Sequence, residues 1–82
     1  MNTENRFQRI ILTVLHSNSR IKKPNLHQLI YESITEDTHP IIYDSFDHRH
    51  GEPYSPQIHD AYDTLYTQNK IYEDGNLFVK LT

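Results

Sequence analysis

The fold is decided by residues 55–81, whose sequence is SPQIHDAYDTLYTQNKIYEDGNLFVKL. This stretch opens with Ser55-Pro56, a hydroxyl that can cap a helix followed by a proline at the first helical position. Apolar side chains then recur with helical spacing, in a stripe made of Ile58, Ala61, Tyr62, Leu65 and Tyr66. We therefore predict a helix that begins at Ser55 and ends near Asn69, a residue that tolerates the left-handed conformation of a helix C-terminus.

A β-hairpin is predicted directly after this helix. Its two strands would be residues 71–73 and 76–81, joined by Asp74-Gly75. The Asp-Gly pair supplies the positive φ angles that a two-residue hairpin turn requires, and it is therefore a specific hairpin signal.

The first half of the chain predicts two more helices with a short extended contact between them. Thr3 can cap the first helix, whose apolar stripe is formed by Phe7, Ile10, Ile11, Val14 and Leu15. The run Ser17-Asn18-Ser19 ends that helix, and Ile21, alone between two cations, suits a one-residue strand contact. Pro24 fits the first position of the second helix, whose apolar residues are Leu26, Leu29, Ile30 and Ile34.

Pro40 prevents the second helix from continuing, and residues 41–46 predict a short strand with Ile42 and Phe46 on one face. Residues 47–53 follow as a loop. The resulting order is helix, strand contact, helix, extended segment, helix and hairpin. We therefore predict an α+β, winged-helix-like fold, in which residues 1–82 form a single domain of three helices, a short strand and a C-terminal β-hairpin wing.

Composition excludes several classes of protein. The chain has 82 residues, a single-domain length, and with 35% hydrophobic residues it is too rich in Leu, Ile and Tyr to be disordered. Cysteine is absent, which excludes disulfides and thiolate metal sites. No apolar run approaches the roughly 20 residues of a membrane span, and the N-terminus lacks the apolar stretch of a signal peptide. We expect a cytoplasmic protein without a membrane partner.

Neither catalysis nor a cofactor is predicted, because the chain has only two glycines and lacks the common nucleophile, phosphate-loop and metalloprotease motifs. Asp60 and Asp63 lie one helical turn apart, but this spacing equally suits a solvated helix face. Nitrogen and oxygen ligands for a metal could come from Asp44, Asp47, His48, His50, His59 and Asp60. Their spacing matches no known metal signature, so we predict an ordinary loop and no metal site.

The charge distribution favours DNA as a partner of the first third of the chain. That third holds Arg6, Arg9, Arg20, Lys22 and Lys23. Phosphate contacts supply much of the affinity of DNA-binding proteins, so the predicted backbone contacts are Arg20, Lys22, Lys23 and, on the wing, Lys80. The predicted contacts to base edges are Gln57, Thr64 and Gln68. The first hypothesis is a DNA-binding transcriptional regulator, for which a homodimer is one candidate assembly. The competing interpretation is that these cations only solubilise the protein.

Acidic side chains in the last third favour a protein partner instead. Asp60 and Asp63 would face phosphates without nearby compensation, and the wing carries Glu73 and Asp74. Tyrosine is a favoured interface residue. The alternative hypothesis is a protein-interaction module, antitoxin-like or inhibitor-like, from a phage or mobile element, with an interface that includes Tyr54, Asp60 and Asp63.

Three segments resemble the Panacea-type domains of phage and toxin–antitoxin proteins. Leu26-His27-Gln28-Leu29-Ile30-Tyr31 is similar to their L-x-K-L-L-Y helix, residues 48–56 (HRHGEPYSP) to their x-Y-G-P-Y-S junction, and residues 61–71 to the helix end that follows. Glu52, between Gly51 and Pro53, departs from that pattern. The resemblance implies a fold related to winged helices and neutralisation of a toxin through protein contacts, and related winged helices often bind DNA.

Overall fold

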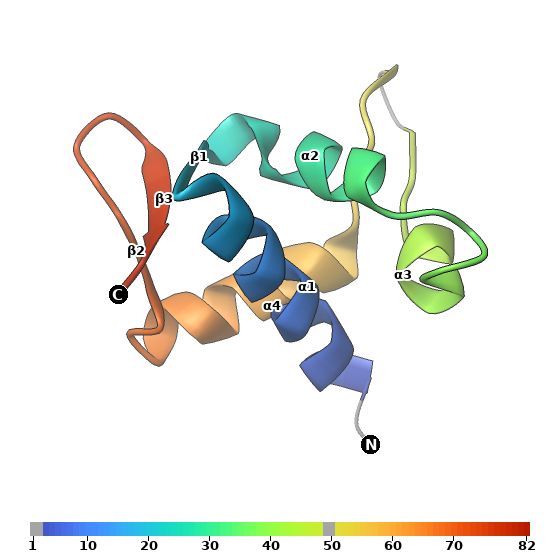
Figure 1. Ribbon diagram of the computed structural model, residues 1–82, viewed down its shortest axis with the longest axis horizontal. Helices are drawn as coiled ribbons and strands as arrows, with labels where there is room; N and C mark the ends of the chain where they lie inside the picture. Colours follow the sequence, from blue (N-terminus) through green and yellow to red (C-terminus); the bar gives the residue numbers. More distant parts are fainter. Residues whose placement is uncertain (1–2, 49–50) are drawn as a thin grey trace.

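The computed structural model describes residues 3–48 and 51–82. Four α-helices and a three-stranded antiparallel sheet form an α+β fold (Figure 1). The elements, in chain order, are α1 (Thr3–Asn18), β1 (Arg20–Lys22), a 3-10 turn η1 (Lys23–Asn25), α2 (Leu26–Ser33), α3 (Pro40–Asp44), α4 (Pro56–Thr67), β2 (Ile71–Glu73) and β3 (Phe78–Leu81). None of the helices in these described ranges is long and apolar enough to cross a membrane.

One core joins the four α-helices and the three strands. The helix α1 crosses α4, and the sheet closes one side of the pair (Figure 1). The predicted apolar stripes point into this core, where Ile11 and Leu15 of α1, Ile30 of α2 and Leu65 of α4 are fully buried. The exception is Tyr66, which was predicted to belong to the stripe of α4 but is 50% exposed. The predicted cap of the first helix, the Thr3 side chain, lies outside the described side chains.

The sheet has the strand order β1-β3-β2, so the last strand of the fold lies in its middle. Ile21 pairs with Val79, and both are buried, which confirms the predicted strand contact at Ile21. Because side chains alternate between the two faces of a strand, the neighbours of Ile21 and Val79 point away from the core.

The ends of α4 follow the sequence prediction. The Ser55 side chain, fully buried, accepts a hydrogen bond from the Ile58 amide at 3.2 Å and also bonds the Ser45 hydroxyl at 2.7 Å. At the other end Asn69 has φ 59°, and the Lys70 amide donates to the Leu65 carbonyl at 3.0 Å. This is a Schellman closure with asparagine in the left-handed position.

The predicted strand over residues 41–46 is wrong, because Pro40–Asp44 form the short helix α3. Pro40 occupies the first turn of that helix, where its missing amide has no partner to lose. Ile42 is buried, Phe46 packs against the core, and Ile41 is exposed. Residues i and i+4 share a face in both a helix and a strand, so the spacing of Ile42 and Phe46 did not distinguish the two.

The hairpin is confirmed, but its predicted two-residue turn is wrong. The Asp74 amide donates to the Phe78 carbonyl, and the Leu77 amide donates to the Asp74 carbonyl. The positive φ angle falls on Leu77, at 65°, so residues 75–77 form a three-residue loop and β3 begins at Phe78 rather than at residue 76. The Asp74 carboxylate fixes this loop by accepting the Asn76 and Phe78 amides.

The second helix also begins and ends differently from its prediction. Pro24 lies in the 3-10 turn η1, and the α-helical part begins at Leu26 and ends at Ser33. Ile34 follows in extended conformation but is still buried. The count of three helices therefore becomes four, with α3 as the addition.

Candidate nucleic-acid interface

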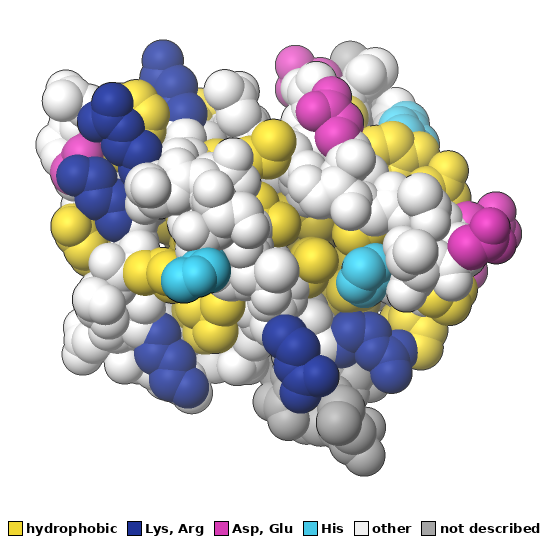
Figure 2. Space-filling model, in the orientation of Figure 1, with side chains coloured by type: hydrophobic (Ala, Val, Ile, Leu, Met, Phe, Trp, Pro, Cys, Tyr) yellow, Lys and Arg dark blue, Asp and Glu magenta, His cyan; other side chains and the backbone are white. Residues whose placement is uncertain are grey.

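Three cations and two aromatic rings share the solvent side of the sheet. The strand register places Lys80 between Arg20 and Tyr72, and Phe78 beside Lys22. We call these five residues, Arg20, Lys22, Tyr72, Phe78 and Lys80, the outer sheet face. The space-filling view shows Lys and Arg side chains gathered over β1 and the hairpin (Figure 2).

The acidic side chains of the hairpin are neutralised by cations of the same region. Lys23 Nζ lies 3.3 Å from Glu73 Oε2, and Lys80 Nζ lies 3.4 Å from Asp74 Oδ2. The pKa of Asp74 is held below its usual range by the Asn76 and Phe78 amides and then by Lys80. Both carboxylates therefore remain charged at neutral pH, but each carries its own counter-charge.

Arg20 and Lys22 are the cations of the outer sheet face that are free to meet an anion. The Arg20 guanidinium lies 4.4 Å from the centre of the Phe78 ring, a cation–π contact that orients the group without neutralising it. Within residues 3–48 and 51–82, neither Arg20 nor Lys22 forms an ion pair. The two side chains are exposed.

The predicted base contacts on α4 do not join this surface. At about 100° per residue, the side of α4 opposite its buried stripe is centred on Asp60, Asp63 and Thr67. Gln57, Thr64 and Gln68 form one flank of that exposed side. The opposite flank, His59 and Tyr66, lies next to Tyr62.

The cations of the sheet region lie on the Tyr62 side of α4. Tyr62 donates a hydrogen bond to Glu73 of β2, and Lys23, His59 and Tyr62 line one shallow hollow of about 300 Å³. The structure thus brings together Arg20, Lys22, Lys23 and Lys80, and it separates them from Gln57, Thr64 and Gln68 by the acidic centre of α4.

The residues predicted for a protein interface are only partly grouped. Tyr54 stacks on His27 with ring centres 4.7 Å apart, and its ring centre is 6.3 Å from that of His59. His59 Nε2 lies 3.4 Å from Asp63 Oδ2, so Tyr54 and Asp63 are linked through His59. Asp60 is exposed on the same helix.

His27 has a structural function in this region. Its Nδ1 accepts the Ser55 amide at 3.1 Å, so the proton of the neutral ring lies on Nε2. Burial, and then the nearby His59, lower the pKa of His27 to about 4. A neutral His27 therefore supports the start of α4 at physiological pH.

The candidate metal ligands are placed in separate surroundings. The His48 ring packs edge-on against Tyr31, whereas His59 pairs with Asp63. His50 lies outside the described residues. Among those that are described, no three side chains of His, Asp or Glu come together in a way that could hold a metal ion.

The prediction from sequence alone did not indicate that Tyr72 and Phe78 belong to the outer sheet face. The signal was present, because Phe78 and Lys80 alternate with the buried Val79. The pairing of Lys80 with Tyr72 and Arg20 could not be anticipated, since it joins segments far apart in the chain.

Comparison of the chain with protein-family models, with characterised proteins and with solved structures found no match.

Proposed function

We propose that the protein is a winged-helix DNA-binding regulator that contacts the phosphate backbone of duplex DNA through its outer sheet face and Lys23. The observation that supports this proposal most directly is a pair of exposed cations without ion-pair partners among the described residues, Arg20 and Lys22 of β1. They lie beside Lys80 of β3. The order helix, strand, helices, hairpin and the central position of β3 support the winged-helix assignment. In this assignment β2 and β3 form the wing.

The acidic side of α4 determines what kind of binding is proposed. Asp60 and Asp63 would repel phosphates if α4 entered a groove, so the interface consists of the wing and β1. Backbone contacts position a protein but carry little sequence information. We therefore expect binding with weak sequence preference, unless a dimer or a second protein adds base contacts.

The test measures salt dependence with a labelled duplex of about 20 base pairs, roughly two helical turns. We expect fluorescence anisotropy to show binding that weakens as salt rises from about 50 to about 200 mM. Replacing Arg20 and Lys22 together by Gln should weaken binding about tenfold and make the salt slope less negative by about 2, one unit for each lost phosphate contact.

The matched control is Arg6→Gln with Arg9→Gln, which removes two cations from α1 instead. Equal loss of binding in both double variants would mean that net charge, not the outer sheet face, governs the interaction. Absence of binding at low salt would refute the proposal. Tighter binding of single-stranded DNA than of duplex would also refute it, and would indicate base stacking on Tyr72 and Phe78.

A second candidate function is the antitoxin-like or inhibitor-like protein module, and the exposed acidic side of α4 is the observation that favours it. Tyr54 and Tyr66 flank this side with 41% and 50% of their surface exposed. The Panacea-type resemblance points in the same direction. Charge-neutralising Asp60→Asn with Asp63→Asn should then abolish binding to a candidate toxin while leaving DNA binding intact or improved.

A further inference from the structure

A long groove lies apart from the outer sheet face, between α1, the end of α2 and α3. Its volume is about 700 Å³, and its lining on α1 extends from Arg6 to Asn18. At 1.5 Å per helical residue, this wall is about 18 Å long. A wall of that length matches a peptide segment of three helical turns better than a small compact ligand.

The floor of the groove is apolar. Ile10, Val14 and Ile42 are core residues that contribute their outer edges to the lining. Ile41 of the short helix α3 also lines it and is 46% exposed. An exposed β-branched side chain beside three core residues gives a partner apolar surface to cover.

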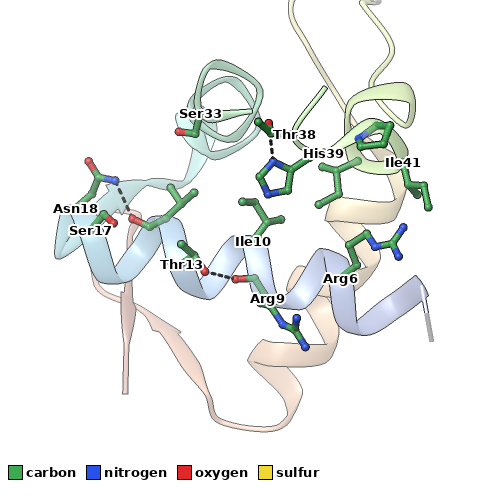
Figure 3. A pocket seen from close by; sticks show the side chains of 13 residues that line it. Arg6, Arg9, Ile10, Thr13, Ser17, Asn18, Ser33, Thr38, His39 and Ile41 are labelled. Atoms are coloured by element: carbon green, nitrogen blue, oxygen red, sulfur yellow. Dashed lines mark hydrogen bonds between the residues drawn. The ribbon is translucent and has the colours of Figure 1, made fainter. Parts of the chain in front are cut away.

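The rim of the groove is cationic. Arg6 and Arg9 are three residues apart on α1, so their side chains leave the same side of the helix. The Arg6 side chain extends toward Ile41 and the His39 ring lies over α1, whereas the Arg9 guanidinium, although Arg9 lines the groove, points away from His39 (Figure 3).

These two arginines have no counter-charge in the groove. None of the residues that line it is acidic. Among the side chains that the structure describes, no carboxylate forms an ion pair with Arg6 or Arg9. The groove therefore combines an apolar floor with unpaired positive charge at one end, and its complement is an apolar surface with negative charge at one end.

We propose that this groove binds an acidic amphipathic helix of a partner protein. Such a helix would lay an apolar stripe with spacing i, i+3 or i+4, and i+7 against Ile10, Val14 and Ile41. Two carboxylates one turn apart on its flank match the spacing of Arg6 and Arg9. This interaction uses a surface separate from the outer sheet face and does not depend on DNA binding.

The test uses a fluorescein-labelled peptide of about 14 residues, designed as an amphipathic helix with a Leu stripe and Glu residues one turn apart. A second peptide carries Lys in place of each Glu. We expect the acidic peptide to raise the fluorescence anisotropy on titration with the full chain, and the Lys peptide to bind at least tenfold more weakly.

Variants then assign the binding to the groove. Arg6→Glu with Arg9→Glu should weaken the acidic peptide at least tenfold, and Ile41→Ser should weaken it severalfold. These side chains lie at the surface or rim, and thermal melts would verify that the variants fold. The matched control, Arg20→Glu with Lys22→Glu, reverses the same charge on β1 and should change peptide affinity less than twofold.

Backbone amide chemical shifts would locate the contact, with the largest changes expected in α1, α3 and residues 38–39. The proposal is overturned if neither peptide binds, if the Lys peptide binds equally well, or if the shifts map to β1 and the hairpin. It is also overturned if sedimentation shows a dimer that Arg6→Glu with Arg9→Glu dissociates, because a second copy of the chain would then be the occupant.

Discussion

The Tyr62 hydroxyl donates a 2.7 Å hydrogen bond to Glu73 Oε2, which joins α4 to β2. Lys23 approaches the same oxygen at 3.3 Å and adds η1 to the contact. The pKa of Glu73 is held below its usual range, first by the Tyr62 hydroxyl and then by Lys23. The pKa of Tyr62 is raised by burial and by the bond to Glu73. One carboxylate thus links the hairpin to the helices.

Removal of the Tyr62 hydroxyl tests this junction. Tyr62→Phe keeps the ring in the core but deprives the Glu73 carboxylate of a donor, so we expect a loss of about 1–2 kcal/mol in the free energy of unfolding. Urea denaturation followed by circular dichroism measures it. Tyr66→Phe, one turn away and 50% exposed, is the matched control and should cost under about 0.5 kcal/mol. Equal effects of the two variants would contradict the assignment.

Acid should destabilise the protein through His27. Its pKa is about 4 in the folded chain and 6.5 when unperturbed, so the unfolded state binds the proton first as pH falls. The stabilisation is complete above pH 6.5 and decreases until the pH passes about 4. Allowing for solvent screening of a half-buried ring, the loss is on the order of 2 kcal/mol.

The variant His27→Asn separates this titration from other acid effects. The Asn side-chain oxygen can occupy the position of Nδ1 and accept the Ser55 amide, but it cannot be protonated in this range. We expect the dependence of unfolding free energy on pH between 6.5 and 4 to flatten. His16→Asn, at an exposed position on α1, is the matched control. An unaltered slope in His27→Asn would rule out the proposed origin.

The Ser55 hydroxyl should contribute more than an ordinary helix cap. It is fully buried, accepts the Ile58 amide and bonds the Ser45 hydroxyl, so Ser55→Ala leaves the buried Ile58 amide without its side-chain acceptor, while Ser45 keeps only its bond to the Ile42 carbonyl. We expect a loss of about 2 kcal/mol or more in the free energy of unfolding. Ser33→Ala removes an exposed hydroxyl that bonds only its own helix and serves as the control. A comparable, small cost for both would show that the buried pair is unimportant.

The left-handed conformation of Leu77 should be measurable as strain. A non-glycine residue at φ 65° costs roughly 1–2 kcal/mol relative to glycine. Leu77 is 52% exposed, so little packing is lost when it is replaced. We expect Leu77→Gly to melt at a higher temperature than Leu77→Ala, a comparison in which only the backbone preference differs appreciably. The reverse order would mean that residue 77 does not hold this conformation in solution.

Local signals in the sequence predicted most of the helices, and non-local contacts explain the errors. Ser55-Pro56 and Asn69 set the ends of α4 through bonds within a few residues, so the chain alone was sufficient. Residues 41–46 lacked such a signal, because the core contact of Ile42 satisfies either a strand or a helix. The Asp74-Gly75 pair predicted a two-residue turn, but the loop has three residues. The Asp74 carboxylate accepts the Asn76 amide in this loop, and the Lys23 amide donates to the Leu77 carbonyl from outside the hairpin.

The candidate site was likewise predictable only in part, where local sequence was sufficient. The cations were identified from the sequence because charge needs no structure to be recognised. Their counter-charges, Glu73 for Lys23 and Asp74 for Lys80, depend on how the hairpin packs, and so does the separation of Arg20 from Gln57. A charge count along the chain therefore overstates how strongly the hairpin repels a polyanion.

The central position of β3 has a consequence for how the protein folds. Arg20 pairs with Lys80, so β1 has no strand partner until β3 is present. During synthesis β1 therefore lacks its strand partner until residues 78–81 have been made. Closing so long a loop is entropically costly, so we expect sheet assembly to be a late step in folding. The outer sheet face, which combines Arg20 of β1 with Lys80 of β3, therefore forms only after β3 has been made.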